Sequence, residues 1–334
     1  MTQDRLAENK QKYRELCAHE RSIQVYIQDW WLDAVCGESH WDVLISYNKD
    51  QSIQGTFALH PSRKWGMRCI IKPQFCQNTG LWLNYPKELT NEKRLSFERE
   101  VCYDLINQLE EYAREHRILF AEITLDPRYT NWLPFYWRGF RQCTRYTYRI
   151  LHLQERSSEE ILTSFDRSKR KNIKRALEQT QLRAKTLTAE AFYRNHKYTL
   201  SCQKQAISYS KELFERMYQY ASERKNSYVV CIEDQAENIH AALFIIKDKE
   251  VAYDLISTID PNFRDSGASS LAVLKAIEIA QQSGLETFDF EGSMIEGVEN
   301  SFRKFGSLQV PYFYLNRIFT KNPLLRRLLR MLLY

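Results

Sequence analysis

The sequence is poor in glycine and proline, which number 10 and 8 among 334 residues. This low content excludes collagen-like and low-complexity linker segments. No apolar run approaches the roughly 18 residues that a membrane-spanning helix needs. The first residues, MTQDRLAENKQKYREL, are polar and charged, unlike a secretory signal. We therefore expect a cytoplasmic protein without a transmembrane segment.

Cysteine occurs eight times, but in no arrangement that indicates a disulfide framework or a zinc site. No two cysteines form a C-x-x-C pair, and none is spaced for zinc from a second cysteine and a histidine. We predict reduced, mostly buried thiols and no bound metal. A Ser-His-Asp signature is also missing, and His40, His60 and His196 form no recognisable group.

Hydrophobic residues make up 43% of the chain and aromatic residues 13%, which is enough for a sizeable core and argues against disorder. The length suits two domains of about 150 residues each. We predict an N-terminal domain over residues 1–152, a C-terminal domain over 153–320 and a separate tail over 321–334.

The apolar pattern of the first domain predicts strands and helices of an α/β (α+β) fold. Thr90 is expected to cap the longest helix. The predicted elements after an initial helix are strands over 42–47, 54–59 and 66–71, a helix over 93–116, a strand over 118–125, a short helix over 132–137 and a strand over 145–151.

The second domain repeats this order at a spacing of roughly 166 residues, near the usual domain size. Ser157 and Glu160 form a capping-box pattern at the start of a basic helix predicted over 157–180. The further predicted elements are a helix over 210–224, strands over 227–233, 240–247 and 250–259, a helix over 266–283, a strand over 286–291, a helix over 297–305 and a strand over 310–315. We therefore predict two copies of one fold, each a mixed, mostly antiparallel sheet flanked by helices.

A strand, a short loop and a helix start follow one another around Gly267. The amino terminus of a helix exposes unpaired N–H groups and a positive partial charge, and glycine lets a ligand approach the backbone closely. This arrangement suits a diphosphate. The residues predicted to bind it are Arg264, Ser266, Gly267, Ala268, Ser269 and Ser270.

This stretch resembles the acyl-CoA pyrophosphate loop of GNAT N-acyltransferases, Gln/Arg-x-x-Gly-x-Gly/Ala, with Ser269 at the last position. The segments 287–293 and 300–306 further resemble the acetyltransferase domain of Fem-type relatives, which contain two GNAT-like halves. The likeness extends to 138–148 and 165–176, and so touches most of the chain. It implies two tandem GNAT-like domains and an acyltransferase whose donor is acetyl-CoA or another acyl-CoA.

The implied reaction transfers an acyl group directly to an amine, which must lose a proton to a nearby base. Asp254 precedes the turn, and Asp289 and Glu291 share one face of the next strand. All three are candidate bases, and Tyr253 is a candidate acid for the leaving thiolate. As alternatives, Asp289 or Glu291 caps a loop or pairs with Arg303, and Tyr253 packs in the core.

The net charge of +6 is concentrated between Arg167 and Arg175. We predict that Lys169, Arg170 and Lys174, together with Arg303, contact an anionic acceptor, which is a small molecule or a lipid- or nucleotide-linked amine. The alternative is a solvated helix face. The tail is basic and amphipathic, so it either lies on an anionic membrane surface as a peripheral contact or docks on the body of the protein.

Acyl transfer from acyl-CoA to an amine in a ternary complex is the main functional prediction, and two alternatives stay open. One is a Fem-type peptidyltransferase that uses aminoacyl-tRNA and acts on a cell-wall precursor; the lack of a long helical-hairpin insertion argues against tRNA. The other is a non-catalytic module that binds RNA or an anionic membrane.

Overall fold

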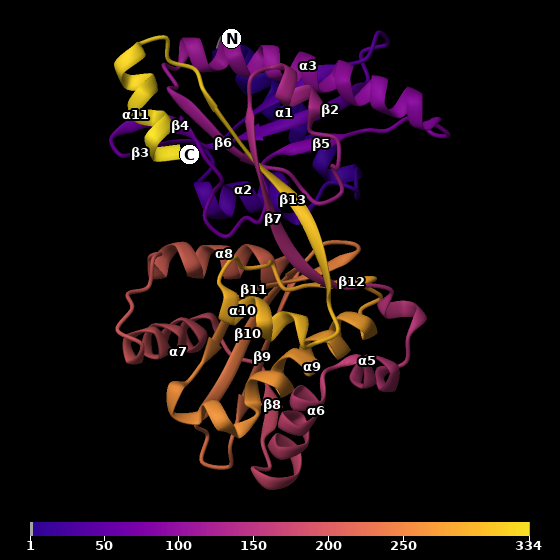
Figure 1. The fold of residues 1–334 in the computed structure, drawn as a ribbon, viewed down its shortest axis with the longest axis vertical. Coiled ribbons are helices and arrows are strands. Elements are labelled where there is room, and N and C mark those ends of the chain that lie inside the picture. Colours follow the sequence, from indigo (N-terminus) through magenta and orange to yellow (C-terminus); the bar gives the residue numbers. More distant parts are fainter. Residues whose placement is uncertain (1–2, 334) are drawn as a thin grey trace. The chain divides into compact units, whose positions relative to one another are not determined.

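The computed structural model describes residues 3–333 and is shown in Figure 1. Met1, Thr2 and Tyr334, which the predicted first domain and tail include, lie outside the described residues. The chain divides into two compact units, residues 1–145 with 311–334 and residues 146–310. The chain enters the second unit within β7 (Arg141–Ile150) and leaves it within β13 (Leu308–Ile318).

The first unit contains two sheets. One is antiparallel and consists of β1 (Asp42–Tyr47), β2 (Ile53–Leu59) and β5 (Leu81–Leu83). The other has the order β3-β4-β6-β13, with β3 (Pro61–Lys64), β4 (Met67–Ile70) and β6 (Phe120–Thr124), and its β4 and β6 are parallel. The helices of this unit are α1 (Gln3–His19), α2 (Asp29–Cys36), α3 (Asn91–Glu115), α4 (Leu133–Trp137) and α11 (Pro323–Leu333).

Helix α3 supplies most of the core of the first unit. Its apolar stripe, which includes Val101, Leu105 and Leu109, is buried against strands of both sheets. Thr90 accepts a hydrogen bond from the main-chain nitrogen of Lys93 and so caps the helix, as the sequence predicts.

The second unit is built on one mixed, mostly antiparallel sheet with the order β7-β12-β11-β10-β9-β8. The parallel pair is β11 (Val251–Ile259) and β12 (Thr287–Asp289). The remaining strands are β8 (Arg183–Lys185), β9 (Ser227–Glu233) and β10 (Ile239–Lys247). The predicted strands over 227–233, 240–247 and 250–259 are thus confirmed to within one residue at each end.

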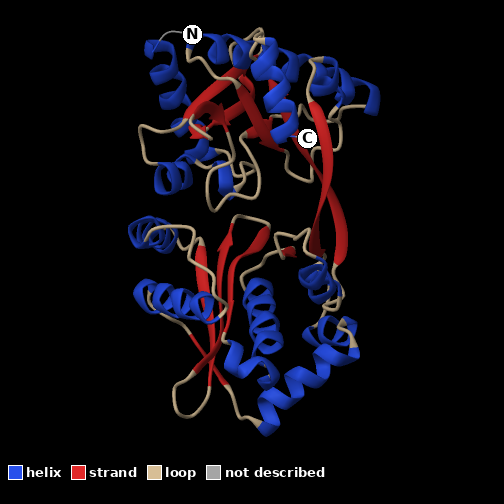
Figure 2. Ribbon diagram, turned by 60° about the vertical axis from the view of Figure 1, so that its left-hand side comes forward, coloured by secondary structure: helices blue, strands red, loops and turns tan. Residues whose placement is uncertain are grey.

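Helices cover both faces of this sheet, as Figure 2 shows. On one face, the hydroxyl of Tyr228 on β9 donates to the carbonyl of Ala276 on α9 (Ala268–Gln282) at 2.8 Å. On the other face, the ring of Phe214 on α8 (Lys211–Glu223) lies 5.9 Å from that of Phe244 on β10. The other helices of the unit are α5 (Ser158–Ser164), α6 (Arg167–Lys174), α7 (Ala189–Cys202) and α10 (Glu296–Arg303).

The prediction of one continuous helix over 157–180 is wrong. Helix α5 ends before Phe165, whose backbone is extended and whose ring packs edge-on against Phe305 with centroids 5.2 Å apart. Asp166 then accepts from the main-chain nitrogen of Ser168 and starts α6 as a new helix, which continues as a π-helical turn over Arg175–Gln179. The break occurs because burying Phe165 and capping with Asp166 outweigh helix propagation at these two residues.

The predicted capping box at the start of α5 is present. The hydroxyl of Ser157 accepts from the main-chain nitrogen of Glu160, and the Glu160 carboxylate accepts from the main-chain nitrogen of Ser157. Ser157→Ala is therefore expected to lower the free energy of unfolding by about 1 kcal/mol, measured by urea denaturation. An unchanged free energy of unfolding in Ser157→Ala would contradict the capping role.

Among residues 3–333, no helix is both long and apolar enough to cross a bilayer. All eight cysteines are free thiols, and the buried ones are Cys69, Cys76, Cys102 and Cys231. No cluster of three or more His, Cys, Asp and Glu side chains suited to a metal ion occurs in the described part of the chain.

Candidate active site

Strands β11 and β12 pair over three residues only, Val251–Tyr253 with Thr287–Asp289. β12 then ends, while β11 continues to Ile259. At the same point β11 carries a β-bulge, because Asp254 pairs with Ile245 and Ile256 with Phe244, so that Leu255 has no partner on β10. Leu255 is therefore the extra residue of the bulge, beside the end of β12. Bulges are frequent beside active sites, where they re-aim backbone groups and side chains.

Asp254 lies directly before this bulge and is 7% exposed. The Ser257 hydroxyl donates to both of its carboxylate oxygens, at 2.9 and 2.8 Å. Burial raises the pKa of Asp254 from 3.8 to about 7, and the hydrogen bonds from Ser257 oppose this shift. A carboxyl group with a pKa near neutrality can accept and return a proton efficiently, and the exposed Ser257 connects it to solvent.

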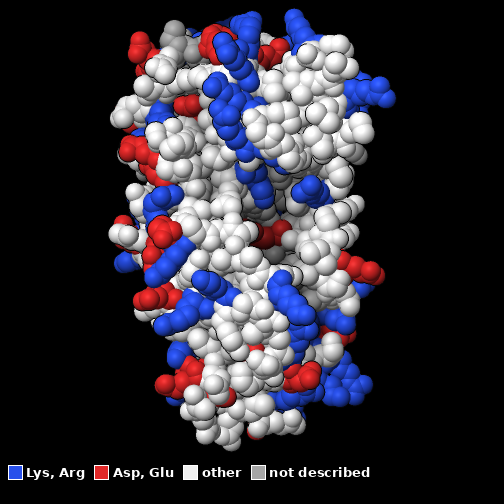
Figure 3. Space-filling view, turned by 90° about the vertical axis from the view of Figure 1, so that its left-hand side faces the viewer, with Lys and Arg blue, Asp and Glu red and all other residues white. Residues whose placement is uncertain are grey.

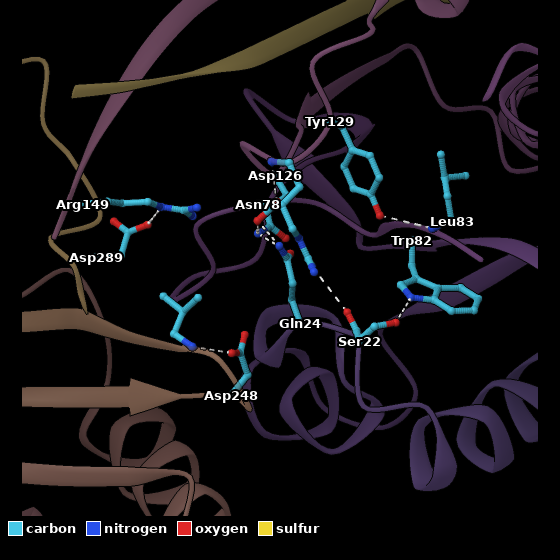
Figure 4. A network of polar contacts seen from close by, with 12 residues as sticks. Ser22, Gln24, Asn78, Trp82, Leu83, Asp126, Tyr129, Arg149, Asp248 and Asp289 are labelled. Atoms are coloured by element: carbon cyan, nitrogen blue, oxygen red, sulfur yellow. Dashed lines mark hydrogen bonds and ion pairs between the residues drawn. The ribbon is translucent and has the colours of Figure 1, made fainter. Parts of the chain in front are cut away.

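Asp289 is fully buried and hydrogen-bonded from three sides. Its carboxylate accepts from the Thr147 hydroxyl, from Arg149 Nε at 2.7 Å and from the main-chain nitrogen of Glu291 at 2.7 Å. Figure 4 shows this contact between the Nε of Arg149 and the Asp289 carboxylate. These donors, one of them the Arg149 guanidinium, tie β7 to the end of β12. This surrounding suits an anchor better than a base.

Tyr253 and Asp289 are register partners on one face of the sheet, opposite the face of Asp254. The Tyr253 hydroxyl donates to Asp248 Oδ2 at 3.1 Å, and the Tyr253 side chain is buried. Glu291 is half-buried, with a positive φ of 60° just after β12. The four predicted catalytic residues therefore do not form one cluster.

The predicted diphosphate turn lies against helix α6. Gly267 has a φ of 83°, and a Cβ placed there would be 2.1 Å from the main-chain oxygen of Asn172. Ser266 and Ala268 are buried beside it, and Ser266 Oγ accepts from the main-chain nitrogen of Ala268 at 3.2 Å. The carbonyl of Asn172 thus packs against Gly267 on the side where a Cβ would lie, so α6 covers this side of the turn.

The remaining residues of this turn are exposed or enclosed to different degrees. Arg264 is exposed and Ser269 is half-buried. Ser270, in the first turn of α9, is fully buried, and its hydroxyl has no hydrogen-bond partner among the described residues.

A family model described as an acetyltransferase (GNAT) domain matches residues 163–300, which include α6, the bulge, Asp254 and the turn. We refer to residues 163–300 as the GNAT domain after this match. This agrees with the predicted class of enzyme, an acyltransferase.

Solved structures support the fold over nearly the whole length. FemX superposes with a TM-score of 0.69 at 13% identity, covering 96% of this chain and 98% of that chain. L-PGS from Bacillus licheniformis superposes with a TM-score of 0.57 at 9% identity, covering 96% of this chain and 95% of that chain. A tandem GNAT protein from the clavulanic acid biosynthesis pathway superposes with a TM-score of 0.53 at 9% identity, covering 96% of this chain and 97% of that chain. The predicted fold of two tandem GNAT-like domains is confirmed. A search of the curated proteins found no match.

Within the GNAT domain, the cations of α6 separate into two groups. Lys169 packs inward, with Nζ 4.1 Å from the centre of the Phe305 ring and 2.8 Å from Ser301 Oγ. Burial and the nearby Lys304 lower its pKa to about 8. The exposed cations are Arg167, Arg170, Lys171 and Lys174, which recur at helical spacing on the outer side of α6. Of the predicted acceptor contacts, only Arg170 and Lys174 belong to this stripe.

Arg303 lies elsewhere, on α10, where its Nε is 3.4 Å from Glu299. The GNAT domain also contains features that the sequence analysis did not select, namely the hydroxyl of Ser257 and the bulge at Leu255. The alternation of buried and more exposed residues along β11 shifts near Leu255. This signal is too short to be recognised in the sequence without knowing the register with β10.

Proposed function

We propose that the chain transfers an acyl group from an activated ester or thioester to an amine by direct attack, and that Asp254 accepts the amine proton. The buried Asp254 beside the bulge carries this proposal. Its pKa of about 7 leaves a useful fraction ionised at neutral pH, and the next residue, Leu255, is the extra residue of the bulge.

In the proposed step, the neutral amine attacks the acyl carbonyl carbon and a C–N bond forms. The bond from that carbon to the oxygen or sulfur of the donor breaks. Asp254 takes the proton that the amine loses, and the leaving oxygen or sulfur takes up a proton in turn. A main-chain N–H at Leu255 suits the negative charge that develops on the carbonyl oxygen.

We further propose aminoacyl-tRNA as the donor, acting on the amine of an anionic, lipid- or nucleotide-linked precursor. The packing of the Asn172 carbonyl against Gly267 leaves less room for a diphosphate of CoA at the predicted turn, which favours another donor. The exposed stripe of α6 suits a polyanion. Because this chain covers 98% of FemX, the missing helical hairpin does not distinguish it from that fold.

Acyl-CoA remains the second candidate donor, because the matching family model is that of an acetyltransferase domain. Gly267→Glu does not separate the two donors, since any side chain at residue 267 would also displace α6. A substitution on the outer face of α6 avoids this problem.

The double variant Arg170→Gln/Lys171→Gln is expected to weaken the binding of uncharged tRNA. Each lost phosphate contact lowers the slope of log K against log salt by roughly 0.7–0.9, so a total decrease of about 1.5 is expected. Fluorescence anisotropy over a salt series measures both the affinity and the slope.

The matched control is Arg194→Gln/Lys197→Gln, which removes two exposed cations from α7. We expect this control to bind tRNA like the wild type. We also expect that adding CoA leaves the melting temperature of the wild-type protein unchanged. Equal tRNA affinity in both double variants, together with thermal stabilisation by CoA, would reject tRNA in favour of acyl-CoA.

A further inference from the structure

Helix α11 docks on the first unit through one stripe of its surface. Leu329 is fully buried in a cluster with Cys69 and Phe120, and Leu325 and Leu333 pack against the same cluster. These three leucines recur every four residues and so lie on one side of the helix. Docking on the first unit explains why this side of α11 is apolar, but it does not explain the other apolar residues of the helix.

A second apolar stripe of α11 is exposed. Leu324 and Met331 are 79% and 76% exposed, and Leu328 and Leu332 are 47% and 43% exposed. A surface helix ordinarily turns polar residues to solvent once its apolar side is docked. In α11 the apolar surface is instead about twice as wide as docking requires, and half of it faces outward.

The remaining side of α11 is basic. Arg326, Arg327 and Arg330 are all exposed, and none forms an ion pair with the described residues. No acidic residue occurs between Pro323 and Leu333. The exposed leucine and methionine side chains are therefore bordered by unneutralised positive charge.

Trp65 extends this surface beyond the helix. It lies between β3 and β4, is 50% exposed, and its ring centre is 6.0 Å from that of Phe120, which belongs to the cluster under α11. The Nζ of Lys64 lies 4.6 Å from the Trp65 ring. Figure 1 shows α11 beside β3 and β4, and in Figure 3 the part of the view that shows this unit contains a broad uncharged area bordered by Lys and Arg. The apolar patch is defined as Trp65, Leu324, Leu328, Met331 and Leu332.

We propose that the apolar patch binds the surface of an anionic lipid bilayer. Its leucine and methionine side chains reach the boundary between headgroups and acyl chains, while the arginines of α11 lie at the level of the lipid phosphates. Tryptophan prefers this interfacial depth. With 11 residues, α11 lies in the plane of the membrane and does not cross it.

Charge complementarity selects the bilayer over a second copy of the chain. In a symmetric dimer formed through α11, the three arginines of one copy would approach those of the other without an acidic partner. An anionic bilayer instead supplies phosphates to every one of them. The proposal goes beyond the acyl-transfer chemistry and brings the protein to a surface where lipid-linked amines reside.

Vesicle flotation tests the proposal with the full chain. The wild type is expected to float with vesicles of phosphatidylcholine mixed with phosphatidylglycerol and much less with phosphatidylcholine alone. Leu324→Ser/Met331→Ser is expected to lower the partition coefficient at least about tenfold, because two large apolar side chains no longer enter the bilayer. Arg327→Gln/Arg330→Gln is expected to reduce binding to the anionic vesicles only.

The matched control is Met294→Ser/Leu308→Ser, which removes one exposed methionine and one exposed leucine from the second unit. It is expected to float like the wild type. Equal flotation of both serine double variants, or a dimer in light scattering that Leu324→Ser/Met331→Ser dissociates, would overturn the proposal. The tRNA affinity of Leu324→Ser/Met331→Ser is expected to stay at the wild-type value, so failure here and failure of the proposed function are distinguishable.

Discussion

Asp254→Asn is expected to lower kcat/KM for acyl transfer by about 10²–10⁴-fold, the usual contribution of a general base. Asparagine keeps the size of the side chain and can still pair with the Ser257 hydroxyl, so the variant should fold. Steady-state kinetics with Asp265→Asn, an exposed carboxylate of the neighbouring 3-10 helix, provides the matched control. An Asp254→Asn enzyme with unchanged kcat/KM would remove Asp254 from the mechanism.

The raised pKa of Asp254 predicts two pH dependences, one of activity and one of stability. Because the ionised form is the base, kcat/KM of the wild type should rise with pH through about 7. Because the folded pKa is raised, the contribution of Asp254 to stability is present below about pH 4 and is lost as pH rises through about 7. Urea denaturation should therefore find Asp254→Asn more stable than the wild type at pH 8, by roughly 4 kcal/mol at most, and not at pH 4.

Arg149→Met is expected to lower the free energy of unfolding by about 3–5 kcal/mol. Asp289 is fully buried, and the variant removes the cation that lies 2.7 Å from its carboxylate. Urea denaturation measures the loss. Adding Asp289→Asn should restore part of it, since the second substitution removes the uncompensated buried charge.

This double-mutant cycle also separates an anchor from a base. If Asp289 is an anchor, Asp289→Asn should lower stability more than it lowers kcat/KM measured on the folded fraction. A loss of kcat/KM as large as that of Asp254→Asn, with unchanged stability, would contradict the anchoring role.

Long, strongly periodic segments were predictable from the sequence. The stripe of α3, the meander of β9, β10 and β11, and the start of α9 all depend on local periodicity and capping. Strands of three or four residues were not found, because so few residues carry too little pattern. Two helices were also missed, and the longer one, α7, buries only Phe192 and Thr199 and so lacks a clear apolar stripe. The missed elements are α2, α7, β3, β5 and β8.

The site was only partly predictable, since its decisive features depend on tertiary contacts. Asp254 could be selected because its strand leads into the turn at Gly267. That Asn172 covers Gly267 follows from the packing of α6 on α9, for which the sequence of the turn contains no signal. The bulge at Leu255 requires the register of β10.

The tail shows the same limit. The sequence left docking and membrane contact as alternatives for residues 321–334. In the structure, Leu329 is buried while Leu324 is 79% exposed, so one helix has an apolar stripe for each role. Which leucines dock depends on the apolar surface around Phe120, which lies about 200 residues away in the chain.

The most direct test of the account is the pKa of the Asp254 carboxyl group, followed by its ¹³C chemical shift in a pH titration and assigned by comparison with Asp254→Asn. We expect a midpoint near pH 7. A midpoint near 4, the value of an ordinary solvated aspartate, would show that Asp254 is not poised as the base and would contradict the proposed mechanism.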